Sequence, residues 1–303
     1  MTTPLPPEHH TPLAHEAQVH VDLAQRVADS PSFAKPDHTR IFVVANQKGG
    51  VGKTTTTVNI AAAMGLRGLR VLVIDLDPQG NASTALNVPH HEGSAGVYEA
   101  IVEGTDIDEL VSPCPDIPGL TVLPASIDLA GAEVELVSLV ARESRLDRAL
   151  QAYLRDCEEA GDVIDYVFID CPPSLGLLTV NAMVAGREVL IPIQCEYYAL
   201  EGLGQLVRNI DLVKAHLNPA LEISTIVLTM YDGRTRLAAG VVEEVRSHFG
   251  DTVLRTTIPR AVRISEAPSY QQTVLTYDPV SSGALSYLEA AREITLSGGE
   301  RPS

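Results

Sequence analysis

The chain has 303 residues and a formal net charge of −17, with 39 acidic residues against 22 basic ones. This length fits one large α/β domain and is too short for two ordinary domains with linkers. No stretch approaches the roughly 18 consecutive apolar residues of a membrane-spanning helix, and the start lacks basic residues before an apolar core. Composition therefore favours a soluble cytoplasmic protein over a secreted or membrane-spanning one.

Residues 1–39 are predicted to form a flexible N-terminal extension. The first seven residues include three prolines and offer no apolar core to bury. Apolar residues within 14–27 fit one short amphipathic helix that docks on the body or on a partner. Few of them are large on any one face, so a weakly ordered tail is the alternative. Pro31 and Pro36 then separate this region from the first strand.

A glycine-rich loop follows the first apolar run, which spans residues 41–45. Residues 48–55 read Lys-Gly-Gly-Val-Gly-Lys-Thr-Thr. Ordinary phosphate-binding P-loops share the Gly-Lys-Thr end, but their pattern requires a glycine where this chain has Gln47. A strand, this loop and an uninterrupted helical run occur together. The order predicts a nucleotide-phosphate site, and a glycine turn that only caps a helix is the weaker alternative.

Each loop residue has an expected task in phosphate binding. Backbone N–H groups at the start of the helix should converge on the phosphates, where the helix dipole favours negative charge. Lys53 should touch the β and γ phosphates, and the Thr54 hydroxyl should hold Mg²⁺. Lys48 lies at the far mouth of the loop and is better placed to reach another subunit. The expected nucleotide-binding residues of the loop are Lys48, Gly49, Gly50, Val51, Gly52, Lys53, Thr54 and Thr55.

Two later apolar runs end in acidic residues. The run at 70–74 leads into Asp75 and Asp77, and the run at 166–169 leads into Asp170. An acid at the carboxyl end of a strand faces the crevice where a doubly wound sheet binds its ligand. We expect only one of Asp75 and Asp77 to face an attacking water. Capping of the following helix or turn is the alternative for each of them.

These segments resemble the ParA/Soj family of chromosome- and plasmid-partitioning ATPases, within the larger group that includes the cell-division positioning ATPase MinD. The resemblance covers residues 40–296 and implies ATP and Mg²⁺ as cofactors. The loop matches the deviant Walker A motif, with Lys48 as the lysine that crosses an ATP-sandwich dimer. Asp77 matches the acid that orients the attacking water. Asp170 matches the Walker B acid, so Thr54, Asp77 and Asp170 are the expected metal-side residues.

Alternation of apolar strands with helical runs from residue 40 predicts the fold class. We expect an α/β domain over 40–296, with a mainly parallel, doubly wound sheet and helices on both faces. The predicted helices are 179–185, 202–217, 241–249 and 284–296, the later strands are 188–193 and 223–230, and residues 253–258 are expected to be extended. Residues 92–120, rich in Gly, Pro and Asp, are expected to form a surface excursion, and 297–303 a flexible tail.

The acidic net charge argues against a nucleic-acid partner, but its distribution matters more. Residues 230–270 carry six arginines and five acidic residues, a net charge of +1. Arginine pairs well with phosphate, and a symmetric dimer doubles any such patch. Resemblance to Soj-type members implies that Arg234 and Arg263 contact nonspecific DNA and that Pro259 lies near the adenine. Without that resemblance, a solvated face is the better interpretation of these arginines.

The resemblance implies an ATP-dependent homodimer that associates with the nucleoid, partitions chromosomal or plasmid DNA and is stimulated by a ParB-type centromere-binding protein. A MinD-like membrane-positioning ATPase is the first alternative, although residues 286–294 carry one basic residue and two acids, unlike a basic amphipathic anchor. An iron–sulfur reductase with the same loop is the second. Cys114 and Cys171 lack its glycine-rich flanks, and all four cysteines, Cys157 and Cys195 included, are expected to be buried thiols.

Overall fold

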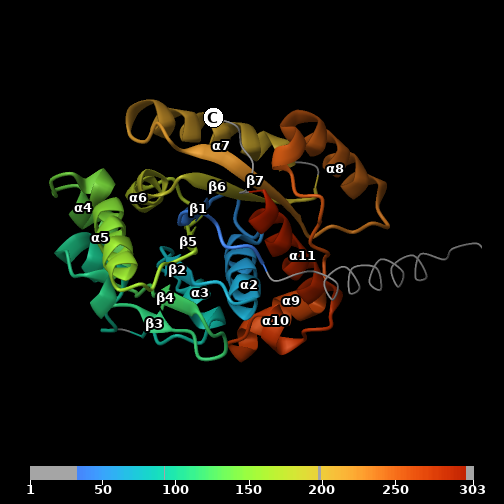
Figure 1. Cartoon of the computed structure of the whole chain (residues 1–303). Helices are drawn as coiled ribbons and strands as arrows, with labels where there is room; N and C mark the ends of the chain where they lie inside the picture. Colours follow the sequence, from blue (N-terminus) through green and yellow to red (C-terminus); the bar gives the residue numbers. More distant parts are fainter. Residues whose placement is uncertain (1–32, 92, 197–198, 298–303) are drawn as a thin grey trace, which may run out of the picture.

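A computed structural model of the chain describes residues 33–91, 93–196 and 199–297 (Figure 1). Its centre is a seven-stranded sheet with the order β3-β4-β2-β5-β1-β6-β7. Every neighbouring pair is parallel except β3 with β4. The predicted mainly parallel sheet is therefore confirmed. Its strands are β1 Arg40–Val44, β2 Val71–Asp75, β3 Ser112–Pro113, β4 Leu120–Leu123, β5 Tyr166–Asp170, β6 Glu188–Gln194 and β7 Glu222–Thr229.

Helices cover both faces of this sheet, as the alternating sequence pattern predicts (Figure 1). Short π or 3-10 turns form η1 Glu99–Glu103, η2 Ile107–Glu109, η3 Arg142–Ser144, η4 Gly250–Thr252 and η5 Ala267–Tyr270. The α-helices are α2 Lys53–Leu66, α3 Asn81–Ala85, α4 Leu129–Leu136, α5 Arg145–Glu159, α6 Leu177–Ala185, α7 Ala199–His216, α8 Arg236–Phe249, α9 Val262–Glu266, α10 Val274–Tyr277 and α11 Ser282–Leu296.

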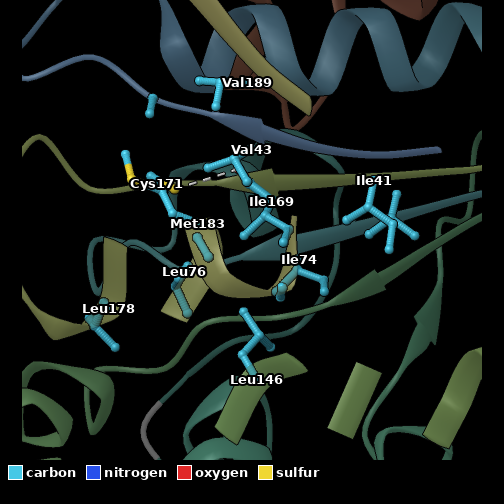
Figure 2. Packing of buried hydrophobic residues seen from close by; sticks show 14 of the residues in the cluster. Ile41, Val43, Ile74, Leu76, Leu146, Ile169, Cys171, Leu178, Met183 and Val189 are labelled. Carbon is cyan, nitrogen blue, oxygen red and sulfur yellow. Dashed lines mark hydrogen bonds between the residues drawn. The ribbon is translucent and has the colours of Figure 1, made fainter. Parts of the chain in front are cut away.

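Strand alternation divides the core into two layers. Ile41 and Val43 of β1 belong to the layer that includes side chains of α5 and α6, shown in Figure 2. Phe42 and Val44 point to the opposite layer, which α2 and α11 cover. Since both faces of the central strands are buried, their sequences are apolar throughout rather than alternating. The parallel arrangement also brings the carboxyl ends of β1, β2, β5, β6 and β7 to one edge, where the site lies.

The packed body begins before the first strand. Phe33 is buried in the layer under α2 and α11. Lys35 Nζ lies 3.4 Å from Asp165, and the Thr39 hydroxyl donates to the Ile164 carbonyl over 2.7 Å. Residues 33–39 thus pack on the domain, although the sequence prediction assigns them to the N-terminal extension. Residues 1–32, with the predicted helix at 14–27, and the tail from 298 lie outside the described residues.

One stretch differs from the sequence expectation. The supposed surface excursion buries Val97, Ile101 and Ile107 in the core, because short helical turns direct these side chains inward. The run at 253–258, predicted only as extended, lies beside β7, where the amides of Leu254 and Ile258 donate to the β7 carbonyls of Ile226 and Leu228 over 3.0 and 2.8 Å. Between these two bonds, the amide of Thr256 donates to the Glu293 carboxylate of α11.

Candidate nucleotide-binding site

The glycine-rich loop connects β1 to α2 in a conformation that depends on glycine. Gly50 and Gly52 have φ of 75° and 89°, which residues with a side chain rarely adopt. Gly52 caps α2, and its carbonyl accepts the amide of Thr56 over 2.8 Å. A Cβ added to Gly49 or Gly50 would meet nothing within 4 Å, so the outer side of the loop faces open space. The loop is therefore free to receive a ligand against its backbone.

A pocket of about 720 Å³ opens against this loop at the carboxyl edge of the sheet. Pockets of this size commonly hold small molecules and cofactors. Its walls come from the loop, the turn after β2, helices α3 and α4, and the turn after β5. The lining residues include Gly49, Gly50, Gly52, Lys53, Thr54, Thr55, Asp77, Gln79, Thr84, Glu133, Pro173, Ser174 and Met230.

Lys53 presents a buried positive charge to the pocket. Only 8% of the residue is exposed, and the described residues offer its ammonium group no ion pair. Burial lowers the pKa of Lys53, although the nearby Asp170, Cys171 and Asp77 oppose that shift. A buried ammonium group without a paired carboxylate is costly unless an anion completes it. Lys53 is therefore suited to a phosphate group, as the sequence predicts.

Asp170 holds the hydroxyls of α2 rather than lining the pocket itself. Its carboxylate accepts the Thr54 hydroxyl over 2.7 Å and the Thr57 hydroxyl over 2.9 Å. Burial and the charge of Asp75 raise the pKa of Asp170 to about 7, while the two hydroxyls and Lys53 act in the opposite direction. Thr54 lines the pocket with its hydroxyl oriented by Asp170, an arrangement that fits the expected metal side of the site.

The two aspartates after β2 have different surroundings. Asp75 is fully buried and accepts both the amide and the hydroxyl of Ser83, over 2.8 and 2.7 Å. Burial raises its pKa to about 6. Asp77 is 9% exposed, accepts the amide of Gln79 over 3.0 Å and lines the pocket. Only Asp77 is thus placed to meet a ligand, while Asp75 fixes the start of α3.

Lys48 stands outside the pocket lining. Its half-exposed ammonium group pairs with Glu196, and its amide donates to the Asn46 side chain over 3.0 Å. Glu196 follows the carboxyl end of β6, at the same edge as Asp77 and Asp170. Sequence reasoning missed Glu196, although an acid just beyond a buried strand is the signal that identified the other two. In this conformation, Lys48 is paired within its own chain.

Val51 and Pro259 occupy positions beside the main pocket. Val51 is buried, and its carbonyl accepts the Thr229 hydroxyl over 2.8 Å, so its part is to fix the loop. Pro259 lines a second cavity of about 170 Å³ beyond the loop. This cavity shares Gly52, Thr55 and Met230 with the first one and is otherwise lined by Thr229, Ile258, Pro259, Arg260, Ala261, Ile264, Ser265 and Tyr287.

The two arginines expected at DNA are exposed and already paired within the chain. Arg234 donates to both carboxylate oxygens of Asp232, over 2.8 and 2.9 Å, and this holds the pKa of Asp232 at about 2. Arg263 on α9 lies 3.2 Å from Glu266 and 3.4 Å from Asp278. Exposed ion pairs of this kind are weak, so phosphate can compete for both guanidinium groups.

The two alternative functions, an iron–sulfur reductase and a membrane-positioning ATPase, depend on the cysteines and on the last helix. Cys114 and Cys171 are buried in opposite layers of the sheet, which does not fit a cluster bridged at a shared surface. Cys195 is also buried, and Cys157 is half-buried. The last helix, α11, buries Tyr287 and Ala290 against the α2 layer. Within the described part of the chain, no helix has the length and apolar character required to cross a bilayer.

The sheet is doubly wound, and a glycine loop follows β1, one of its inner strands. Together with a buried lysine and a strand-end acid beside a threonine, this arrangement defines a P-loop nucleotide-binding protein. The lysine at position 48 and the missing first glycine place it in the deviant Walker A class. Residues 39–223 match the family model described as an AAA domain.

Known relatives make the assignment more specific. The chain is 49% identical over 259 residues to the sporulation initiation inhibitor protein Soj of Bacillus subtilis, covering 86% of this chain and 99% of Soj. It is 49% identical to the chromosome partitioning protein ParA of Caulobacter vibrioides over 84% of this chain and 93% of that protein. The chain belongs to the Soj/ParA family of chromosome-partitioning ATPases.

A solved structure is similar across the same region. It is described as cobyrinic acid a,c-diamide synthase from Mycobacterium smegmatis with bound ATP analogue and magnesium. The two chains are 38% identical, the TM-score is 0.70, and the match covers 84% of this chain and 93% of that one. A nucleotide and its metal are thus accommodated by a closely similar domain.

Proposed function

We propose that this protein is an ATP-dependent dimerising switch that binds DNA without sequence preference and segregates chromosomal or plasmid DNA with a ParB-type partner. The observation that carries the proposal is the split between the two loop lysines. Lys53 is buried in the pocket, whereas Lys48 lies outside it and is paired with Glu196. A lysine in that position is available to the nucleotide of a second subunit.

The pocket fits ATP with Mg²⁺. The loop backbone and Lys53 would hold the phosphates, while Thr54 and the Asp170 behind it would hold the metal side. Bound Mg²⁺ supplies positive charge that neutralises the phosphate oxygens during phosphoryl transfer. Asp170 would then be needed as a carboxylate, and the positive charge of the metal would oppose the burial that raises its pKa to about 7. Closely similar domains that carry a nucleotide and magnesium support this assignment.

Asp77 is the residue we assign to hydrolysis. Hydrolysis of a phosphoanhydride is mainly a matter of positioning and charge stabilisation, so an acid beside the attacking water orients it. Asp77 lines the pocket, and its acceptance of the Gln79 amide fixes the carboxylate. We expect slow ATP hydrolysis until a partner completes the site, because slow hydrolysis lets the ATP-bound state act as a timer.

The ion pair between Lys48 and Glu196 would have to break before Lys48 could reach a second subunit. Both side chains are partly exposed, so their contact costs little to break in water. A second subunit's triphosphate, with its higher charge, would compete for Lys48. Dimerisation is therefore expected to require ATP rather than ADP, since only ATP offers the γ-phosphate to the second subunit.

Co-sedimentation tests this function with one protein sample and three nucleotide states. DNA and liposomes containing anionic lipid are each mixed with the protein in the presence of ATP, ADP or no nucleotide, always with Mg²⁺. The proposal predicts that the protein pellets with DNA only in ATP. Pelleting with liposomes but not with DNA would instead indicate a MinD-like positioning ATPase. Equal pelleting with DNA in all three states would contradict the proposal that ATP controls DNA binding.

A further inference from the structure

The turn after β2, which carries Asp77, packs against the side chain of His90. The Asp77 carbonyl accepts the Gly80 amide over 2.9 Å and closes this turn. Gly80 has φ of 62°, in the region that favours glycine. A Cβ added to Gly80 would lie 2.7 Å from Cδ2 of His90, so the imidazole ring rests directly on this residue. His90 does not line the nucleotide pocket, so it touches the turn without meeting the ligand.

Helix α3 ends in a cap that directs the chain back toward this turn. Asn87 has φ of 54°, and its amide donates to the Thr84 carbonyl over 3.1 Å. The Val88 amide donates to the Ser83 carbonyl over 3.0 Å, which completes a Schellman cap. Val88 is buried in the core layer under α2 and α11. His90 therefore leaves from a fixed point on the body of the protein.

Both ring nitrogens of His90 have partners in this segment. Nδ1 lies 2.9 Å from the Val88 carbonyl, which can only accept, so Nδ1 carries a hydrogen and donates it. Nε2 lies 3.0 Å from the Thr84 hydroxyl, and that hydroxyl also donates to the Gly80 carbonyl over 3.0 Å. Thr84 lines the nucleotide pocket. The ring thus reaches the pocket wall through one intervening side chain.

We infer that His90 is a positioning residue for ATP hydrolysis, which holds the Asp77 turn through Thr84 and Gly80. The inference rests on the proposed function, in which Asp77 orients the attacking water. The Asp77 carboxylate accepts the amide of Gln79, a residue of the same turn, so its position depends on the turn. Misplacement of a reacting group by about 1 Å can slow a reaction by about 100-fold. His90 lies outside the phosphate loop, so its effect should fall on hydrolysis rather than on ATP affinity.

The test compares two amides of different length in place of the ring. His90→Asn keeps a donor near the Nδ1 position but does not reach Thr84, whereas His90→Gln places its amide near the Nε2 position. His90→Phe keeps a ring and removes both nitrogens. His91→Asn is the matched control, because His91 is an exposed neighbour that contacts Ser94. His90→Asn is also made in the Asp77→Ala background. ATP hydrolysis is measured with Mg²⁺, after thermal melting has shown each variant to be folded.

His90→Asn and His90→Phe should each lower kcat about fivefold or more with KM unchanged within about twofold, whereas His90→Gln and His91→Asn should keep kcat within about twofold. In the Asp77→Ala background, His90→Asn should change kcat less than about twofold, because the carboxylate that it positions is gone. The inference is overturned by an unchanged kcat in both the Asn and Phe variants, by an equal loss in the Gln variant, or by an undiminished loss in the Asp77→Ala background. A natural protein that does not hydrolyse ATP, or an Asp77→Ala variant as fast as the natural protein, would overturn the proposed function instead.

Discussion

At the scale of single residues, the site contains buried ionisable groups whose charged forms the described residues do not fully stabilise. Lys53 is buried without a paired carboxylate among the described residues, and Asp170 is buried beside Asp75 with a raised pKa. Desolvation disfavours each charged form, whereas a bound phosphate and metal would favour both. Strongly perturbed groups of this kind concentrate at functional sites, which agrees with their position around one pocket.

The role of Asp77 predicts a variant that binds ATP but cannot use it. Asp77→Ala should retain ATP affinity, because Lys53 and the loop backbone remain, and should hydrolyse ATP at least about 100-fold more slowly. It should also stay on DNA after ATP addition, since release follows hydrolysis. Phosphate release and DNA dissociation are measured on the same sample. A hydrolysis rate equal to that of the natural protein would assign water orientation to another residue.

The buried Asp170 predicts how stability depends on pH without nucleotide. Its pKa is about 7 in the folded protein, while an unfolded chain titrates near 3.9, so the folded state binds more protons between these values. The contribution of Asp170 to the free energy of unfolding should therefore fall as pH rises from about 4 to about 7.

Asp170→Asn removes this titration. In urea unfolding with a chelator present, the variant should lose less stability than the natural protein between pH 5.5 and pH 7.5. The buried Asp75 remains in both proteins, so some pH dependence should persist. A variant that loses as much stability as the natural protein over this interval would show that Asp170 is ionised throughout.

At the scale of elements, the expected DNA contacts lie outside the nucleotide pocket. Arg234 precedes α8, and Arg263 lies within α9, so neither residue belongs to the loop or the pocket walls. Both side chains are held by carboxylates in the monomer. DNA binding by these elements would exchange those ion pairs for phosphate, which makes the affinity strongly dependent on salt.

Arg234→Ala and Arg263→Ala should each weaken ATP-dependent DNA binding while leaving ATP affinity and dimerisation intact. Four arginines in a dimer give a log–log salt slope of about −3 to −4, and loss of one pair should flatten it by about 2. Sequence preference should not change, because phosphate contacts carry no base information. Arg155→Ala on α5 removes an exposed arginine outside this region and serves as the charge control. An unaltered slope in both variants would place the DNA surface elsewhere.

At the scale of the whole molecule, the sequence predicts what depends on local pattern. Continuous apolar strands such as 41–45 and the glycine loop follow from short stretches, and the structure contains both. Contacts between distant segments do not follow in this way. The Lys48–Glu196 pair and the Thr229–Val51 bond join residues more than a hundred positions apart. Burial of Ile101 likewise depends on the helical turn η1, which the sequence pattern does not reveal because the surrounding stretch is rich in glycine and proline.

The central claim is that ATP brings two copies together through Lys48. Light scattering with Mg-ATP in the Asp77→Ala background measures it most directly, because slow hydrolysis preserves the ATP state. The account predicts a particle of twice the 32.4 kDa chain mass with ATP and a monomer with ADP. Adding Lys48→Ala should return the ATP sample to a monomer while nucleotide binding persists. A monomer in ATP, or a dimer that survives loss of Lys48, would contradict the account.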